Sequence, residues 1–143
     1  MMRVIGLLAC FWVTACAPPG PPRELEGLWS RSDGACRIGA GIRFGADAVR
    51  IFYGRSDEVL FDAPRYRVDR RGAVARIAIA YRRPNDAPSA AARTLILERD
   101  EGDSLRPARH GFADGATGSV RIDLDSDDLQ RAMTLRRCPD PSD

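Results

Sequence analysis

The amino-acid sequence predicts an all-β fold, a small antiparallel β-barrel of about eight strands, with a β-sandwich as the alternative. From Glu24 onward, apolar and polar residues alternate with a period of two, which is typical of strands that bury one face. Turn signals recur about every eight to twelve residues, as in small barrels and sandwiches. No window of eleven or more residues shows a helical period, apart from a weak candidate at residues 127–133.

Alternation predicts six strands in the first part of the domain, at residues 25–30, 42–44, 48–53, 59–61, 65–68 and 73–82. Pro64 separates the fourth from the fifth, because proline lacks the N–H that a strand ladder needs. Residues 69–72 (Asp-Arg-Arg-Gly) predict a turn in which Gly72 takes a positive φ. In the sixth strand the spacing places five apolar residues on one face: Ala73, Ala75, Ile77, Ile79 and Tyr81.

Residues 84–90 contain two prolines, an asparagine and an aspartate, and predict a loop. A strand at 93–99 follows, with Leu95 and Leu97 on one face and Ile96 on the other. After a turn at 101–103, residues 104–118 show no clear pattern. Strands at 120–124 and 133–137, separated by a turn at 125–128, complete the expected fold.

The start of the chain resembles the export signal of bacterial lipoproteins. Met1-Met2-Arg3 precedes an uncharged apolar stretch, and Val13-Thr14-Ala15-Cys16 is similar to the lipobox of that family. The resemblance implies a signal peptide at 1–15, lipidation of Cys16 by acyl chains such as palmitate, a proline-rich tether at 16–23 and a single barrel domain at 24–143. It also implies a periplasm-facing protein of the cell envelope. Ala17 after the anchor favours the outer membrane.

Three alternatives to lipidation at Cys16 remain open. Leu7-Leu8-Ala9-Cys10 also fits a lipobox loosely, but it leaves too short an apolar region ahead of it. Ala15-Cys16-Ala17 fits plain secretion, although cleavage there would leave a proline at the new terminus. The segment could also be retained as a short anchor.

Cys36 and Cys138 remain once the signal and the anchor are set aside. In an exported protein an even pair predicts a disulfide, here closing a loop of about a hundred residues. No thiol is then left to act as a nucleophile. Two cysteines without nearby histidines also make a poor zinc site.

The charge balance does not indicate nucleic-acid binding. All 22 basic residues are arginine, against 20 acidic residues. Residues 37–83 carry a net +6 and residues 98–128 a net −5. Either these are a basic face for anionic lipid or glycan beside an acidic one, or they are strands whose charges pair across the sheet. The second interpretation is favoured.

No catalytic, metal or cofactor site is predicted. The aspartates at 123, 125, 127 and 128 begin like a calcium loop, but Asp128 replaces the glycine and Thr134 the glutamate that such a loop needs. His110 is the only histidine. A triad of His110 and Asp114 with Ser104 or Ser119 lacks any nucleophile elbow. The chain is therefore expected not to be an enzyme.

Gly27-Leu28-Trp29 resembles the G-x-W motif of lipocalins and related small barrels. The resemblance covers only the first and last strands. It implies that Trp29 closes the barrel floor and that an arginine of the last strand, Arg136 or preferably Arg137, stacks on the tryptophan ring. The alternative is that Trp29 is simply a core aromatic residue.

The sequence therefore predicts a lipid-anchored binding or structural module, with an apolar small molecule or an envelope protein as partner. The alternative is an inhibitor of an envelope hydrolase, a lysozyme or protease, that acts through the exposed loop at 84–92. An enzyme with an unrecognised site is the third possibility. A hollow apolar barrel would favour the first, and a filled barrel with an ordered loop the second.

Overall fold

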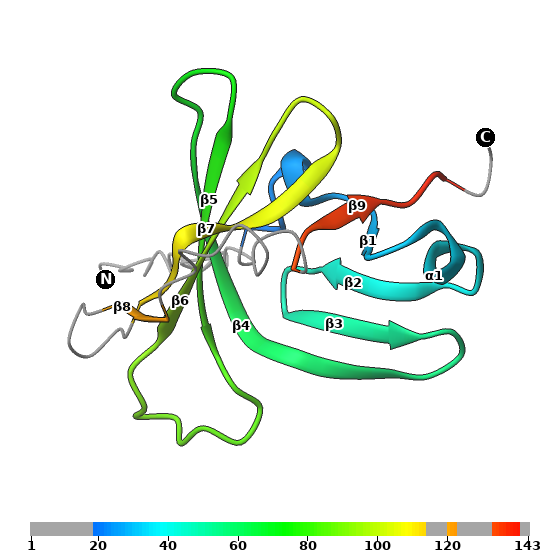
Figure 1. Cartoon of the computed structure of the whole chain (residues 1–143). Coiled ribbons are helices and arrows are strands. Elements are labelled where there is room, and N and C mark those ends of the chain that lie inside the picture. The colour runs from blue at the N-terminus through cyan, green and yellow to red at the C-terminus, as the bar shows by residue number, and fades with distance from the viewer. Residues whose placement is uncertain (1–18, 114–119, 123–132, 141–143) are drawn as a thin grey trace, which may run out of the picture.

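The computed structural model describes residues 19–113, 120–122 and 133–140. Figure 1 shows its strands wrapped into a barrel. Nine strands are present in this part of the chain: β1 (Leu28–Ser30), β2 (Ala40–Phe44), β3 (Ala48–Tyr53), β4 (Asp57–Asp69), β5 (Ala75–Arg82), β6 (Arg93–Arg99), β7 (Ser104–Ala113), β8 (Val120–Ile122) and β9 (Leu135–Arg137). Two short helices accompany them, the 3-10 helix η1 (Arg23–Leu25) and α1 (Asp33–Arg37). Cys16 and the predicted signal peptide lie outside the described residues.

Eight of the strands close into an antiparallel barrel in the order β1-β2-β3-β4-β5-β6-β7-β9, with β9 returning to β1. Each strand up to β7 pairs with the next along the chain, as in an up-and-down meander. The ninth strand, β8, pairs only with the far end of β7, where Phe112 opposes Ile122. The barrel prediction is thus confirmed, and the sandwich alternative is not what the chain adopts.

One long strand, β4, replaces the two that the sequence predicts on either side of Pro64. Its pairing with β5 shifts register between Asp62 and Arg65, and Ala63 has a φ of 46°. Such a bulge bends the strand and accommodates a residue that cannot donate to the ladder. Before the bulge β4 pairs mainly with β3 and after it with β5, so the predicted break is a corner of the barrel.

A second long strand, β7, runs through the region where the sequence shows no pattern. One edge of β7 pairs with β6, and the other pairs with β9 at Ser104 and Leu105. Leu105, Pro107 and Ala108 are all buried. Because Pro107 and Ala108 are adjacent, the alternation of buried and exposed residues along the strand is lost at this point. The pairing with β6 changes register at the same point, between Leu95 and Leu97.

The core is formed by the inward faces of the strands. The expected faces of β5 and β6 are confirmed at Ile77, Ile79, Tyr81, Leu95 and Leu97, which are buried, whereas Ala73 precedes β5 and is exposed. The ring of Phe61 stacks on that of Tyr81 with centroids 3.8 Å apart. The predicted turn also has its positive φ, 82° at Gly72.

Charged residues on neighbouring strands pair across the sheet, once between the two oppositely charged segments and twice within a segment. Arg76 on β5 lies 3.3 Å from Glu98 on β6, and Arg106 on β7 lies 3.6 Å from the same carboxylate. Arg50 on β3 contacts Asp57 on β4 at 2.6 Å. These pairs support the interpretation that the charged residues of the strands pair with one another across the sheet.

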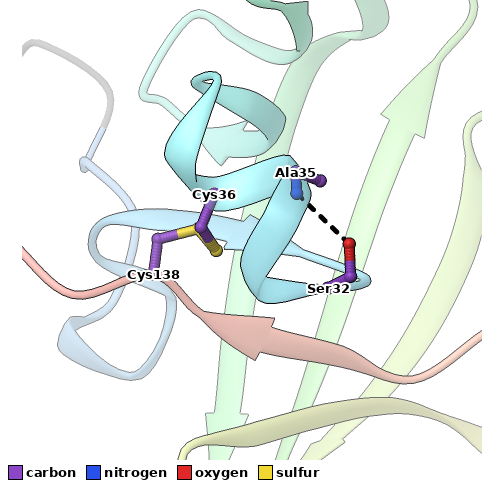
Figure 2. Close-up of a disulfide and its surroundings, with 4 residues drawn as sticks. All are labelled: Ser32, Ala35, Cys36 and Cys138. Atoms are coloured by element: carbon purple, nitrogen blue, oxygen red, sulfur yellow. Dashed lines mark hydrogen bonds between the residues drawn. A yellow bond between two sulfur atoms is a disulfide. The ribbon is translucent and has the colours of Figure 1, made fainter.

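The short helix α1 was not predicted, because five residues are too few to show a helical period. Ser32 caps it by accepting a hydrogen bond from the Ala35 amide at 3.2 Å (Figure 2). The helix packs on β1 and β2. Where those strands approach, a Cβ on Gly41 would lie 2.4 Å from the Trp29 carbonyl oxygen, so the close pairing of β1 with β2 requires glycine there.

Candidate functional site: an apolar cavity in the barrel

Trp29 and Leu25 close one end of the barrel. Both side chains are fully buried, and the indole Nε1 of Trp29 donates a hydrogen bond to the Leu25 carbonyl oxygen at 3.2 Å. This bond satisfies the one polar atom of the ring and holds η1 across the end of β1. We call this end, formed by η1, Trp29 and the β1–β9 seam, the floor.

Arg137 lies directly opposite Trp29 in the β1–β9 pairing, as closure of the barrel requires. Its side chain passes beside Gly27, where an added Cβ would lie 3.2 Å from the arginine Nε. The expected stacking on Trp29 is not found: in the described part of the chain, the guanidinium that lies over an aromatic ring is that of Arg43, 5.4 Å from the centroid of Phe52. Register alone does not place a long side chain on a ring.

Hydrogen bonds join the floor to the neighbouring turns. Arg70, just after β4, donates from Nε to Glu24 in η1. This hydrogen bond holds the pKa of Glu24 below its usual value. Burial of the carboxylate acts against this effect and raises the pKa, whereas the positive charge of the nearby Arg99 also lowers it. On the β9 side, the Arg137 amide donates to the Asp103 carbonyl oxygen at 3.2 Å. Figure 1 shows η1 on the same side as the β4–β5 and β6–β7 turns.

The disulfide between Cys36 and Cys138 fastens the same seam from outside. Its Cα atoms are 5.5 Å apart, and it joins α1 to the segment after β9 (Figure 2). The Cys138 amide also donates to the Leu28 carbonyl oxygen at 2.8 Å. The predicted pairing of the two cysteines is therefore present in the structure.

An apolar cavity of about 280 Å³, partly open to solvent, lies within the barrel. Of the twelve described residues that line it, eleven are apolar and come from six strands and the approach to β9: Ile42, Phe44, Val49, Leu60, Phe61, Leu95, Leu97, Leu105, Pro107, Met133 and Leu135. Its volume is near the lower end of the range of about 300–1,000 Å³ that is typical of small-molecule sites. Within the described residues, this part of the barrel interior is therefore not filled by side chains.

Among the described residues that line the cavity, one is charged, Arg31. It directly follows β1, next to the buried Ser30, and its side chain is exposed. The same arginine borders a second small hollow of about 190 Å³ beneath α1. A guanidinium at the exposed edge of an apolar space supplies a single cationic group with several hydrogen-bond donors.

A larger hollow, of about 600 Å³, lies outside the barrel beside the disulfide. It is bordered by charged side chains of both signs, among them Asp33, Arg37, Arg43 and Asp140. Such a mixed, water-facing surface offers an apolar ligand little burial, so the cavity within the barrel is the stronger candidate site.

The predicted loop at 84–92 is present and is braced by its own hydrogen bonds. The Asp86 carboxylate accepts from the Arg83 amide at 2.9 Å and from Arg93 at 2.6 Å, and Arg82 donates to the Pro88 carbonyl oxygen at 2.8 Å. The bond from the Arg83 amide is the main reason why the pKa of Asp86 is lowered. The loop is thus exposed and fixed in shape.

Several candidate residues are not described in enough detail to place. Cys16, Asp114, Ser119 and the aspartates of the calcium-like segment lie outside the described residues. His110 lies on β7, but its side chain is not described. Within the described residues, no cluster of three or more His, Cys, Asp or Glu side chains could hold a metal ion.

In comparisons with known proteins, no family model, curated protein or solved structure matches this chain. Among the described residues, the helices are all too short to cross a membrane.

The sequence analysis did not identify the cavity or Arg31. The signal that could have found the lining was the excess of large apolar residues with alternate spacing, such as Ile42 with Phe44 and Leu95 with Leu97. Alternation identifies the inward face of a strand, but whether opposite strands fill the space between them depends on how the barrel closes.

Proposed function

We propose that this protein is a binding module of the cell envelope that takes a small apolar ligand into its barrel. The observation that carries the proposal is the apolar cavity of about 280 Å³. Ile42, Phe61 and Leu135 line it and are only half-buried, and among the described residues no side chain fills the space in front of them. An apolar ligand would complete their burial, which is the main driving force for such binding.

The test uses two variants at neighbouring positions of β6. Leu97 faces the cavity, whereas Ile96 faces outward. Leu97→Phe should reduce the binding of an apolar fluorescent probe such as N-phenylnaphthylamine, because the larger ring occupies the cavity. Ile96→Phe adds a similar group outside and should leave probe binding unchanged. Equal binding by both variants and the native protein would place the probe elsewhere and overturn the proposal.

The lipocalin relation and the lipid anchor belong to the same proposal. Trp29 at the barrel floor opposite Arg137 supports the first. For the second, Pro19 borders a hollow beside the β2–β3 turn, at Ala46 and Asp47. This is the floor end of the barrel, so a lipid on Cys16, three residues earlier, would hold the floor toward the bilayer and leave the Arg31 end facing away from it.

Anchoring is tested by the intact mass of the protein extracted from membranes. A chain that begins at Cys16 and carries added acyl groups supports the proposal, and Cys16→Ser should accumulate as an unprocessed precursor. An unmodified chain that begins after Ala17 would show plain secretion instead.

The braced loop at 84–92 favours a second candidate function, inhibition of an envelope hydrolase. A loop that is already fixed in shape loses little conformational entropy on binding, as is typical of protease inhibitors. Arg93→Ala, which removes the 2.6 Å contact with Asp86, should weaken inhibition of a lysozyme or protease panel. Arg76→Ala, which removes an ion pair away from the loop, is the control. No inhibition by the native protein at any concentration would exclude this role for the enzymes tested.

A further inference from the structure

We propose that one outer face of the barrel docks on an anionic phospholipid surface. We call it the basic face and define it by four exposed arginines at the end of β4 and in the turn that follows: Arg65, Arg67, Arg70 and Arg71. The proposal rests on the lipid anchor of the proposed function, which would bring the domain to the bilayer. It goes further by specifying which side of the floor end meets the membrane.

Two arginines of the basic face take no part in the ion pairs that join other strands. Arg65 and Arg67 are exposed residues on the outward side of β4. The β5 residues opposite them, Ala80 and Ala78, are too short to reach a guanidinium. Among the described residues, no carboxylate pairs with either arginine. Pairing across the sheet, which accounts for Arg76, therefore leaves these two charges unexplained.

The two turns at the floor end, which Figure 1 shows on the same side of the barrel, differ in charge. Residues 65–71, which lead into the β4–β5 turn, carry a net charge of +3, whereas residues 99–103, at the β6–β7 turn, carry −2. Glu24 and Asp47 lie beside the first segment and reduce its charge without cancelling it. An anionic surface would therefore attract the first turn and repel the second.

The tether emerges beside the basic face. Pro19, the first described residue, borders a hollow with residues 63–66 of β4, which include Arg65. Three residues of chain span at most about 11 Å, so an acyl group on Cys16 would hold the bilayer within about that distance of Pro19. This is close to the Debye length of about 8–10 Å, over which arginines still attract anionic lipid head groups. A lipid and a basic patch together hold a domain to a membrane more firmly than either alone.

Two fluorescent labels at the floor end test the proposal on the full-length protein purified from membranes. Ala73→Cys labels the β4–β5 turn and Gly102→Cys the β6–β7 turn, both at exposed positions. Because Cys36 is joined to Cys138 and Cys16 would carry the lipid, the added cysteine can be labelled alone. The protein is bound to vesicles that carry a quencher on their head groups. With phosphatidylglycerol present, the first label should be quenched more than the second. In phosphatidylcholine alone, or at high salt, the two should be quenched equally.

Variants of the two unpaired arginines test their role. Arg65→Gln/Arg67→Gln should lower the ratio of docked to undocked protein about fivefold for each arginine removed. The variant should unfold at the same temperature as the native protein, because neither arginine has a partner in the described part of the chain. The control is Arg55→Gln/Arg83→Gln, which makes the same change of charge at exposed arginines of the turns after β3 and β5, at the other end of the barrel. The control should dock as the native protein does.

The outcomes separate this inference from the anchor on which it rests. Equal quenching of the two labels on anionic vesicles, or a difference that survives Arg65→Gln/Arg67→Gln, overturns only this inference. A protein that does not float with either kind of vesicle lacks the anchor, and then both proposals fail. Equal quenching together with binding to heparin that Arg65→Gln/Arg67→Gln abolishes would assign the basic face to an anionic glycan and overturn docking on lipid.

Discussion

The floor and the cavity are two regions of one barrel that are packed in opposite ways. At the floor, Trp29 and Leu25 are fully buried and joined by a hydrogen bond, with a disulfide fastening the adjoining seam. In the cavity, large apolar residues such as Ile42 and Leu135 face inward but are only half-buried. Protein interiors are normally close-packed, so an apolar space of this kind inside a cross-linked barrel indicates a role other than stability.

The comparison also bears on what each region would contribute to the proposed binding module. A barrel with an unfilled interior lacks some packing contacts. The stability that those contacts would contribute must therefore come from elsewhere in the fold. The floor supplies it through the bulkiest buried side chain and the covalent link between α1 and the segment after β9. A rigid closed end then allows the interior beside it to remain unfilled.

Truncation at the floor should have the largest effect on stability. Trp29→Ala removes a fully buried aromatic ring and its hydrogen bond to Leu25, and should lower the free energy of unfolding by about 3–5 kcal/mol. Leu60→Ala, at a half-buried residue of the cavity, should cost clearly less, about 1–2 kcal/mol, because part of its surface is not packed. Urea denaturation measures both. Equal losses would contradict the distinction between the two regions.

Loss of the disulfide should have the next largest effect. The bridge spans 102 residues, and the chain-entropy model predicts that removing it by Cys36→Ala/Cys138→Ala lowers the free energy of unfolding by about 2–5 kcal/mol. Intact protein should also show no reactive thiol at these positions until it is reduced. The native protein in reductant is the control and should show the same loss. Apolar-probe binding should persist at temperatures where the variant remains folded, since the bridge lies outside the barrel.

Filling the cavity should have a smaller effect of opposite sign. Leu97→Phe adds contacts with Phe44 and other lining residues that are absent in the native protein, and should raise the free energy of unfolding by about 0.5–2 kcal/mol. Ile96→Phe, on the outer face of the same strand, should change it by less than about 0.5 kcal/mol. Thermal or urea unfolding of the two variants gives the comparison. A destabilised Leu97→Phe protein would mean that the space around Leu97 is already closely packed.

Local patterns in the sequence were sufficient to predict the regular strands and the seam. The limits of β3 and β6 agree with those expected, because each alternates without interruption between clear turn residues. The disulfide was predicted from a count of cysteines in a chain that is expected to be exported. The pairing of the first with the last strand followed from the resemblance around Trp29, since closure of a barrel must bring those strands together.

The features that were missed depend on tertiary structure. Pro64 interrupts the pattern of β4, yet a bulge at Ala63 allows the strand to continue around the corner of the barrel. Pro107 and Ala108 are adjacent and both buried, which hides the period of β7. The position of the Arg137 guanidinium and the hollow beside Leu97 arise from packing between strands that are distant in sequence, for which no local pattern exists.

The smallest expected effect concerns the pH dependence of the floor. The hydrogen bond from Arg70 lowers the pKa of Glu24 below its usual value of about 4.5, so folding favours the ionised carboxylate. The stability that this group contributes is therefore fully present above the unfolded pKa and is lost as the pH falls through the lower, folded pKa. Glu24→Gln should accordingly be less stable than the native protein at pH 7, and the difference should shrink as the pH is lowered below about 4.5. Urea unfolding at pH 7, 5, 4 and 3 measures it, with Glu26→Gln, at an exposed position two residues away, as the control. A difference between Glu24→Gln and the native protein that stays constant over this range would show that Glu24 holds the floor by packing rather than by charge.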